Sequence, residues 1–175
     1  MSPIDEKVLE PLRQGMINEV RGHAFYLEAA KRSKHSAGAK MFKSLASDEQ
    51  LHLKVLQQQY QAITKKGKWL TMEQARKAKA PAPELNLFPA GLEKQMPTDA
   101  DDLKAMELAM VAEKRGYDLY KAAAKVSTDL TAKAMYEFLV KEETGHYDLL
   151  QNSLDYLRDK GMWYFQDEEK PMFEG

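Results

Sequence analysis

Hydrophobic side chains recur every three or four positions along four long stretches of the chain, and this spacing predicts amphipathic α-helices. The expected helices cover about residues 4–32, 37–65, 98–126 and 130–161. The first stretch shows the pattern plainly, with Val8, Leu12, Met16, Val20 and Leu27. Signals that end or begin helices lie between the stretches, among them Gly67 and the segment Ser127-Thr128-Asp129. The chain is therefore predicted to be all-α.

Residues 66–98 break this pattern, because they contain four of the seven prolines together with several large hydrophobic side chains. A flexible linker rarely carries so much apolar surface. We therefore expect a long crossover that packs along the helices, with one helical turn near Thr71–Lys79. It would join two helical hairpins, which cover about residues 4–65 and 99–160.

The last residues, 161–175, are expected to form a short C-terminal tail. The aromatic triplet Trp163-Tyr164-Phe165 lies in this tail and is predicted to dock on the bundle or on a second subunit. Hairpins, crossover and tail together are predicted to form a single domain over residues 1–175.

The two predicted hairpins repeat one another at a constant offset of 94 residues. Seven of the 13 positions in residues 19–31 are identical in residues 113–125, and six of the 20 positions in residues 41–60 are identical in residues 135–154. The alignment needs no gap. Two hairpins of one design are expected to pack about a pseudo-twofold axis.

Each repeat carries one glutamate that is followed, 30 residues later, by a Glu-x-x-His motif. Residues three apart on a helix lie on one face, so the glutamate and the histidine of a motif can hold one metal ion together. In four-helix bundles that hold a pair of metal ions, each of the four helices contributes glutamate or histidine ligands. The predicted metal ligands are Glu19, Glu49, His52, Glu113, Glu143 and His146.

The charges of this ligand set balance, since four ionised carboxylates carry −4 and two divalent metal ions carry +4. Without metal, four carboxylates that face one bundle core would take up protons, because burying charge is costly. Carboxylate and imidazole ligands without a thiolate favour two iron ions, with manganese or zinc as the alternatives. Six protein ligands leave positions open for water, oxygen or peroxide.

Two tyrosines follow the first glutamate of each repeat by seven residues, which is two helical turns along the same face. Tyr26 and Tyr120 are therefore candidate catalytic residues whose hydroxyls would hydrogen-bond ligand carboxylates; ordinary core tyrosines are the alternative. Asp48 and Glu142 precede the Glu-x-x-His motifs, and each is expected to orient a histidine ring of the opposite hairpin. A single Glu-x-x-His motif would be weak support for a metal site, but two motifs in register are not.

The overall composition excludes several classes of function. The net charge of −1 provides no long-range attraction to nucleic acid or to an anionic membrane. The absence of cysteine excludes disulfides, zinc ribbons and a rubredoxin-type iron site. The N-terminus has no apolar signal core and no run of 18 apolar residues occurs, so a soluble cytoplasmic protein is expected.

With both glutamate–tyrosine elements and both Glu-x-x-His motifs in place, roughly residues 4–160 resemble the rubrerythrin-like branch of the ferritin-like superfamily. The resemblance implies a ferritin-like four-helix bundle, the same six ligands, and a homodimer with or without helices swapped between subunits. Members of this family reduce hydrogen peroxide at a di-iron centre, and relatives oxidise Fe(II) with oxygen.

The chain departs from that family in two respects. Rubrerythrins usually add a four-cysteine rubredoxin domain that delivers electrons, whereas this chain has no cysteine. Electrons are therefore expected from a separate donor, such as a rubredoxin-like protein, or from Fe(II) itself. Rubrerythrins also carry an extra carboxylate one turn after the glutamate of the third helix, where this chain has Gly116, matched in the first repeat by Gly22.

These observations support three hypotheses for the function. The first is a di-iron oxidoreductase of the peroxidase or ferroxidase type that reduces hydrogen peroxide or oxygen. The second is a non-catalytic iron-binding or storage protein of the bacterioferritin type. The third is a helical bundle that binds a partner protein and whose metal site is vestigial or filled by zinc.

Overall fold

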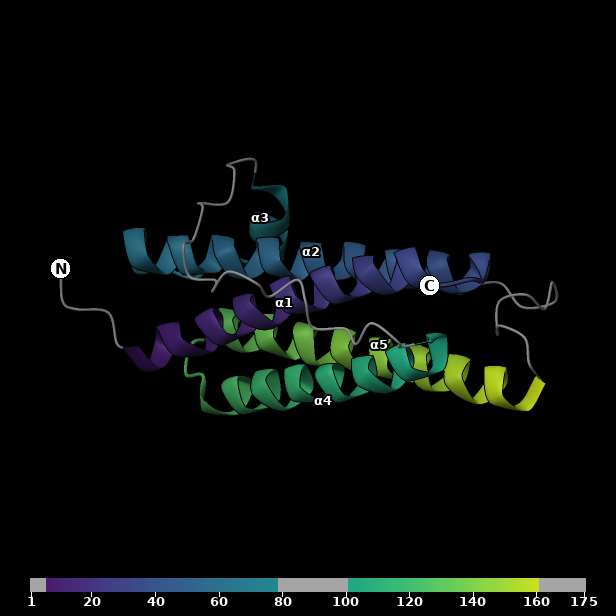
Figure 1. Ribbon diagram of the computed structural model, residues 1–175. Helices are drawn as coiled ribbons and strands as arrows, with labels where there is room; N and C mark the ends of the chain where they lie inside the picture. The colour runs from purple at the N-terminus through teal and green to yellow at the C-terminus, as the bar shows by residue number, and fades with distance from the viewer. Residues whose placement is uncertain (1–5, 79–100, 161–175) are drawn as a thin grey trace.

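The computed structural model describes residues 6–78 and 101–160, and every regular element within them is a helix. The helices, drawn in Figure 1, are α1 (Glu6–Arg32), α2 (Ser36–Lys66), α3 (Met72–Lys77), α4 (Asp102–Val126) and α5 (Leu130–Lys160). The predicted all-α, ferritin-like bundle is therefore confirmed, and α1, α2, α4 and α5 are its four long helices.

The four long helices form two antiparallel hairpins that lie against each other along their length (Figure 1). Helices α1 and α2 make the first hairpin, α4 and α5 make the second, and α1 packs on α4 between them. Helix α3 is short and packs on the outer side of α2. This arrangement brings the two sequence repeats face to face.

Local signals place the helix ends close to where the sequence pattern puts them. Gly67 ends α2 in the left-handed conformation, with a φ of 63°, and its N–H donates to the carbonyl of Ile63. The carboxylate of Asp101 accepts from the backbone N–H of Lys104 at the start of α4. Asp129 accepts in the same way from the first turn of α5.

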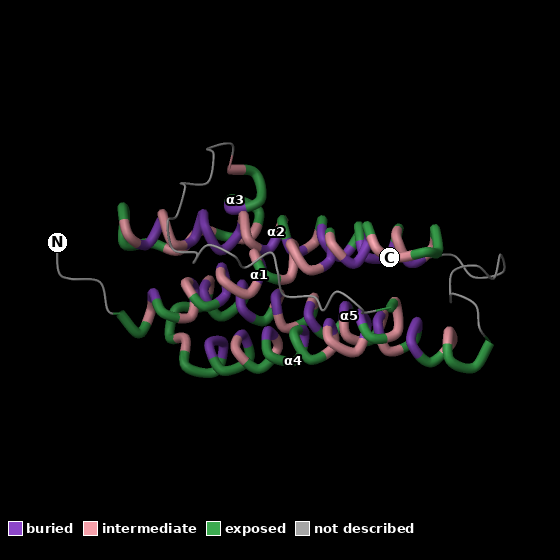
Figure 2. The backbone as a smooth tube through the Cα atoms, in the orientation of Figure 1, coloured by how far each residue is buried: buried purple, intermediate pink, exposed green. Residues whose placement is uncertain are grey.

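The hydrophobic core consists of two apolar layers with a polar layer between them. One layer contains Tyr26, Phe42, Met106 and Leu150, and the other contains Leu12, Leu56, Tyr120 and Leu139. On each long helix the predicted ligands lie between residues of the two layers. Figure 2 shows that buried positions recur along all four long helices. Truncating one core leucine to alanine typically lowers the free energy of unfolding by about 2–5 kcal/mol. The packing of the two apolar layers therefore stabilises the bundle on both sides of the polar layer.

One buried side-chain amide binds the backbone of the segment between α2 and α3. The side chain of Gln59 is fully buried, donates through Nε2 to the carbonyl of Leu70 at 2.7 Å, and accepts from the Leu70 N–H at 2.9 Å. Thr71 and Gln74 then form a capping box at the start of α3, so the helical turn expected near Thr71–Lys79 is confirmed. The expected packing of the remaining crossover and of the aromatic tail concerns residues outside those described.

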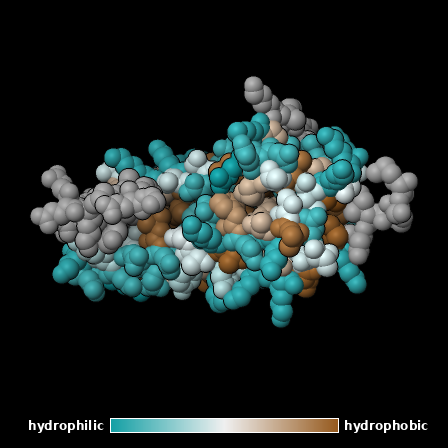
Figure 3. All heavy atoms as spheres, turned by 180° about the vertical axis from the view of Figure 1, so that it is seen from behind, coloured by the Kyte–Doolittle hydropathy of each residue, from teal (hydrophilic) through white to brown (hydrophobic). Residues whose placement is uncertain are grey.

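Hydrophilic side chains cover most of the described surface that faces the viewer in Figure 3, with hydrophobic atoms exposed in patches between them. None of the described helices combines the length and the hydrophobicity needed to cross a membrane.

We predict that Gln59→Ala lowers the free energy of unfolding by about 1–3 kcal/mol, because both backbone groups of Leu70 lose their partner. The measurement is urea unfolding followed by circular dichroism. Gln50→Ala is the matched control, since Gln50 is an exposed residue of the same helix. Equal destabilisation by the two substitutions would contradict this account of the segment.

Candidate metal centre

The six predicted ligands meet in the polar layer at the middle of the bundle. All six are buried, and each of the four long helices contributes at least one of them. Their ligand atoms form two groups, and within each group every atom lies within 4.8 Å of the others. The first group is Glu19, Glu49, His52 and Glu143, and the second is Glu49, Glu113 and His146. Two neighbouring positions for metal ions follow, with Glu49 shared between them.

The two histidines have equivalent surroundings in the two repeats. Nδ1 of His52 lies 3.5 Å from a carboxylate oxygen of Glu19 and 3.9 Å from one of Glu143. Nδ1 of His146 lies 3.3 Å from Glu113 and 3.2 Å from Glu49. Each imidazole therefore faces one glutamate of its own hairpin and one of the other hairpin, as a shared centre on a pseudo-twofold axis requires.

The buried polar atoms of this layer fit a metal pair. Among the described residues, eight buried side-chain nitrogen or oxygen atoms lack a hydrogen-bond partner, and seven of these belong to the six predicted ligands. Unpaired buried polar atoms are costly, and such atoms are normally hydrogen-bonded or coordinated to metal. Every one of the six residues offers at least one such atom to the cluster. The donor set, carboxylate oxygen and imidazole nitrogen, is one that iron and manganese accept.

Two tyrosines hold ligand carboxylates across the bundle. Tyr26 on α1 donates its hydroxyl proton to Oε1 of Glu113 on α4, and Tyr120 on α4 donates to Oε1 of Glu19 on α1. In both glutamates the other oxygen, Oε2, is left without a hydrogen bond and faces the cluster. Burial, reinforced by the neighbouring carboxylates, raises the pKa of both tyrosines well above 10, so the phenols remain protonated donors.

Two further carboxylates lie behind the histidine rings. Nε2 of His52 is 3.6 Å from Glu142, and Nε2 of His146 is 3.6 Å from Asp48. Both contacts cross from one hairpin to the other, as the sequence analysis expected. A carboxylate behind a ligating imidazole orients the ring and increases its basicity.

Glycines allow two of the carboxylates to lie directly against a helix backbone. A Cβ atom at Gly116 would lie 2.5 Å from Oε2 of Glu143, and one at Gly22 would lie 3.1 Å from Oε2 of Glu49. Gly116 is the position at which the resemblance to rubrerythrins led us to expect an extra carboxylate. In this chain a side chain at that place would meet the carboxylate of Glu143, which would have to move aside.

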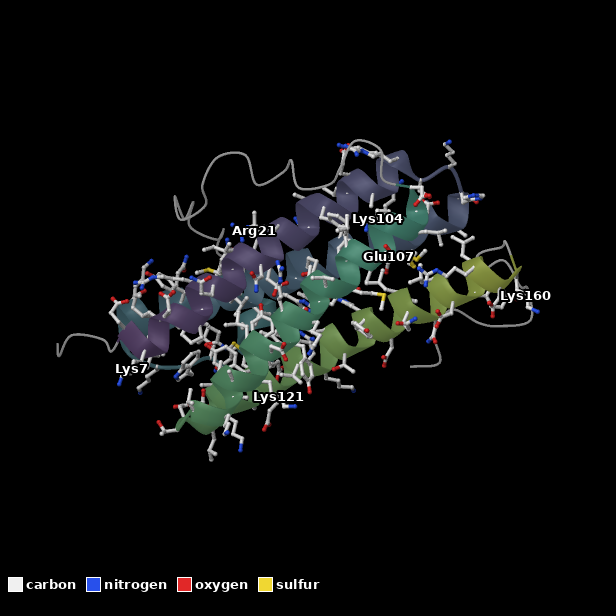
Figure 4. The ribbon with its side chains drawn as sticks, turned by 60° about the horizontal axis from the view of Figure 1, so that its bottom comes forward. Lys7, Arg21, Lys104, Glu107, Lys121 and Lys160 are labelled. Atoms are coloured by element: carbon white, nitrogen blue, oxygen red, sulfur yellow. The ribbon has the colours of Figure 1, made fainter. Side chains whose placement is uncertain are left out.

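A hollow of about 270 Å³ between α1 and α4 connects this centre with the outside. Its inner wall includes Glu19, Glu49, Glu113 and Glu143, together with Gly22 and Gly116. Arg21, which Figure 4 labels on α1, and its repeat counterpart Arg115 are exposed and also line the hollow. The helical pattern did not predict this opening, although the Arg-Gly pair is identical in both repeats and marks its position.

The electrostatics of the cluster favour protons or metal ions over free charge. Burial, and then the charge of Glu19, raise the pKa of Glu49 and of Glu143 well above its ordinary value. Burial alone would lower the pKa of His52 and His146, but the carboxylates around them raise both values above 6.5. The metal-free cluster is therefore expected to bind protons, which divalent metal ions would displace.

A four-helix bundle that buries four carboxylates and two imidazoles in one layer defines the class of ferritin-like metal-carboxylate proteins. The family model Rubrerythrin matches residues 10–154, a range that contains all six clustered side chains. The chain belongs to the rubrerythrin family. Among solved structures it is similar to a hypothetical protein from Pyrococcus furiosus, with 21% sequence identity, a TM-score of 0.66, and coverage of 89% of this chain and 93% of that one. That likeness concerns the fold alone. No curated protein matches the sequence.

We predict that Gly116→Ala weakens metal binding by roughly tenfold or more, because its methyl group must push the Glu143 carboxylate aside. Gly22→Ala should have a smaller effect, since the contact there is longer. The measurement is a Co(II) titration of metal-free protein followed by absorption. Gly145→Ala is the control, because nothing lies within 4 Å of its added methyl group. Equal affinity in all three variants would argue against the close approach of Glu143 to α4.

The raised pKa values also predict how the stability of the metal-free protein changes with pH. Above the ordinary values of 4.5 for Glu49 and Glu143 and 6.5 for the two histidines, the folded state holds more protons than the unfolded chain. The free energy of unfolding should therefore fall as the pH rises from about 5 to about 8. Thermal unfolding with a chelator measures this trend, and saturating Co(II) should remove it. A metal-free protein that becomes more stable over this range would contradict the account.

Proposed function

We propose that this protein is a di-iron oxidoreductase that reduces hydrogen peroxide or oxygen. The observation that carries the proposal is the cluster of six buried side chains whose unpaired atoms face one another beside a hollow that opens to the outside. Iron bound there would supply the electrons for the reduction. Fe(II) itself or a separate donor, such as a rubredoxin-like protein, would restore them.

The charges and donor types of the cluster support iron. Four carboxylates balance two divalent ions, and a set dominated by oxygen donors suits iron or manganese better than zinc. The two imidazoles would each hold one ion, while Glu49, which belongs to both groups of ligand atoms, would lie between them.

The side chains around the cluster have separate tasks in this proposal. The apolar layers on both sides of the ligand layer would limit the access of water, and the hollow between α1 and α4 offers an approach for a small oxidant. Tyr26 and Tyr120 hold Glu113 and Glu19 through hydrogen bonds to Oε1, which leaves Oε2 of each carboxylate available to a metal ion. Asp48 and Glu142 keep the two imidazoles oriented toward the metal ions.

We further propose a homodimer in the cytoplasm as the working form, which the resemblance to rubrerythrins suggests. Size-exclusion chromatography would separate this form from a hollow shell of many subunits, which an iron-storage protein of the bacterioferritin type would form.

We predict that protein purified from iron-replete cells contains about two iron ions per chain, as a six-ligand dinuclear site requires. Stopped-flow mixing of the Fe(II) protein with hydrogen peroxide should then produce the absorption of an oxo-bridged di-ferric centre. His146→Ala should abolish this absorption, because it removes the imidazole of one metal position.

Glu137→Gln is the control for this experiment, since it alters an exposed carboxylate on the same helix. Iron-loaded protein that does not react with peroxide or oxygen would exclude the enzyme. Zinc in place of iron would favour a partner-binding bundle.

A further inference from the structure

The hollow between α1 and α4 is larger than hydrogen peroxide or oxygen requires. Its volume is about 270 Å³, close to the lower end of the range for pockets that hold small organic ligands, which is about 300 Å³. Hydrogen peroxide and oxygen each contain only a pair of oxygen atoms and would leave most of this space to water. The hollow therefore has room for an oxidant with an organic part.

The residues that line the hollow change in character from its floor to its outer end, the mouth. The floor carries the four ligand glutamates, which are buried. Phe25 and Leu108 are half-buried and form an apolar wall above them. Val111, Arg21 and Arg115 are exposed and therefore belong to the mouth. A wall that is apolar and a mouth that is cationic suit a molecule with an apolar chain and an anionic outer end.

One arginine of each repeat lies at the mouth. Arg21 on α1, labelled in Figure 4, and Arg115 on α4 are equivalent positions, 94 residues apart. Within residues 6–78 and 101–160 neither guanidinium has an ion-pair partner, whereas Arg13, Arg32 and Arg158 each pair with a glutamate. The two arginines at the mouth are thus available to a ligand.

The charges that line the hollow favour an anion once metal ions are bound. Among the described residues, the charged lining consists of four glutamates and the two arginines. Two divalent ions would balance the four carboxylates, which leaves the two guanidinium charges without a counter-charge. Such a region attracts anions and repels cations over roughly a Debye length, about 8 Å at physiological ionic strength. An anionic substrate is therefore favoured at the mouth, and Fe(II) is disfavoured there.

We propose that the hollow selects an organic hydroperoxide that carries a carboxylate, which Arg21 and Arg115 hold while the hydroperoxide points to the ligand cluster. This inference rests on the proposed function and names the substrate class of the same site. A guanidinium binds a carboxylate through two parallel hydrogen bonds, which fix the orientation of the substrate as well as its charge. The short apolar chain between the two groups lies against Phe25 and Leu108.

The reduction of such a substrate balances with the electrons that the proposed function already supplies. The O–O bond of R–O–OH breaks, two electrons come from the Fe(II) pair, and two protons come from solvent. The products are the alcohol R–OH and one water molecule. Arg21 and Arg115 position the substrate and take no part in the bond breaking.

Binding is tested without turnover, on protein loaded with Zn(II), which keeps its oxidation state. Isothermal titration calorimetry compares hexanoate with hexanol and hexylamine, which are neutral and cationic molecules with the same chain length. Hexanoate should bind more tightly than either, and its affinity should fall as salt is added. In Co(II)-loaded protein hexanoate should leave the metal absorption unchanged, because the carboxylate is held at the mouth and does not bind the metal.

Matched variants test the two arginines. Arg21→Gln and Arg115→Gln should each weaken hexanoate binding roughly two- to fivefold, as expected for exposed ion pairs, and both together about tenfold. Lys125→Gln is the control, because it removes the same charge from an exposed residue of α4 that is not part of the hollow. All three positions are exposed, so the variants are expected to fold.

The same variants should change the preference of the Fe(II)-loaded protein among oxidants. Stopped-flow absorption compares a hexanoate that bears a hydroperoxide at the far end of its chain with hexyl hydroperoxide, which lacks the carboxylate. The rate with the anionic hydroperoxide, relative to the neutral one, should fall about tenfold when both arginines are replaced, in line with the lost binding. In Lys125→Gln this ratio should equal that of the unchanged protein.

The outcomes distinguish this inference from the function on which it rests. Hexanoate that binds no better than hexanol, binding that the arginine substitutions leave unchanged, or an altered Co(II) absorption would each overturn the inference. The di-iron function would then still stand if the iron-loaded protein reacts with hydrogen peroxide or oxygen. Iron-loaded protein that reacts with none of these oxidants would overturn both the function and its substrate, even where hexanoate binds.

Discussion

The structure depends on one constraint, which is the burial of four carboxylates and two imidazoles in a single layer of the bundle. Such a layer is unfavourable in a metal-free core, because burial penalises charge and leaves polar atoms without partners. The apolar layers on either side supply the hydrophobic burial that offsets this cost. Metal ions or protons must supply the remaining compensation, and burial raises the pKa of Glu49 and Glu143, which favours proton uptake when metal is absent.

The internal repeat explains how a chain can position so many charged groups at once. The two hairpins share the same spacing of tyrosine, acidic and histidine residues. For each of these contacts from the first hairpin to the second, the equivalent residues make the same contact from the second hairpin to the first. Tyr26 reaches Glu113 while Tyr120 reaches Glu19, and the acids behind the histidines are exchanged in the same way. The α1–α4 contact is thus linked by phenol–carboxylate pairs, and the α2–α5 contact by imidazole–carboxylate pairs. The centre is therefore part of what holds the two hairpins together.

Departures from the repeat carry the chemical differences between the two halves. The glycine pair Gly22 and Gly116 preserves the symmetry and lets two carboxylates lie close to helix backbones. The pair Phe42 and Tyr136 breaks it without changing the ring packing. Trp69 has a place only beside the second repeat, because it comes from the segment between α2 and α3.

The all-α fold, the long helices and the six side chains that meet in the polar layer could all be predicted from the sequence. This was possible because helix periodicity, the i to i+3 spacing of each Glu-x-x-His motif and the offset of 94 residues are all local or repeated features. The tertiary structure decided which tyrosine holds which glutamate, how close Glu143 lies to Gly116, and that Trp69 meets Tyr136. These contacts join residues far apart in the chain, and they depend on how the two hairpins face each other and on where the segment after α2 returns to the bundle. Neither spacing nor composition encodes those relative positions.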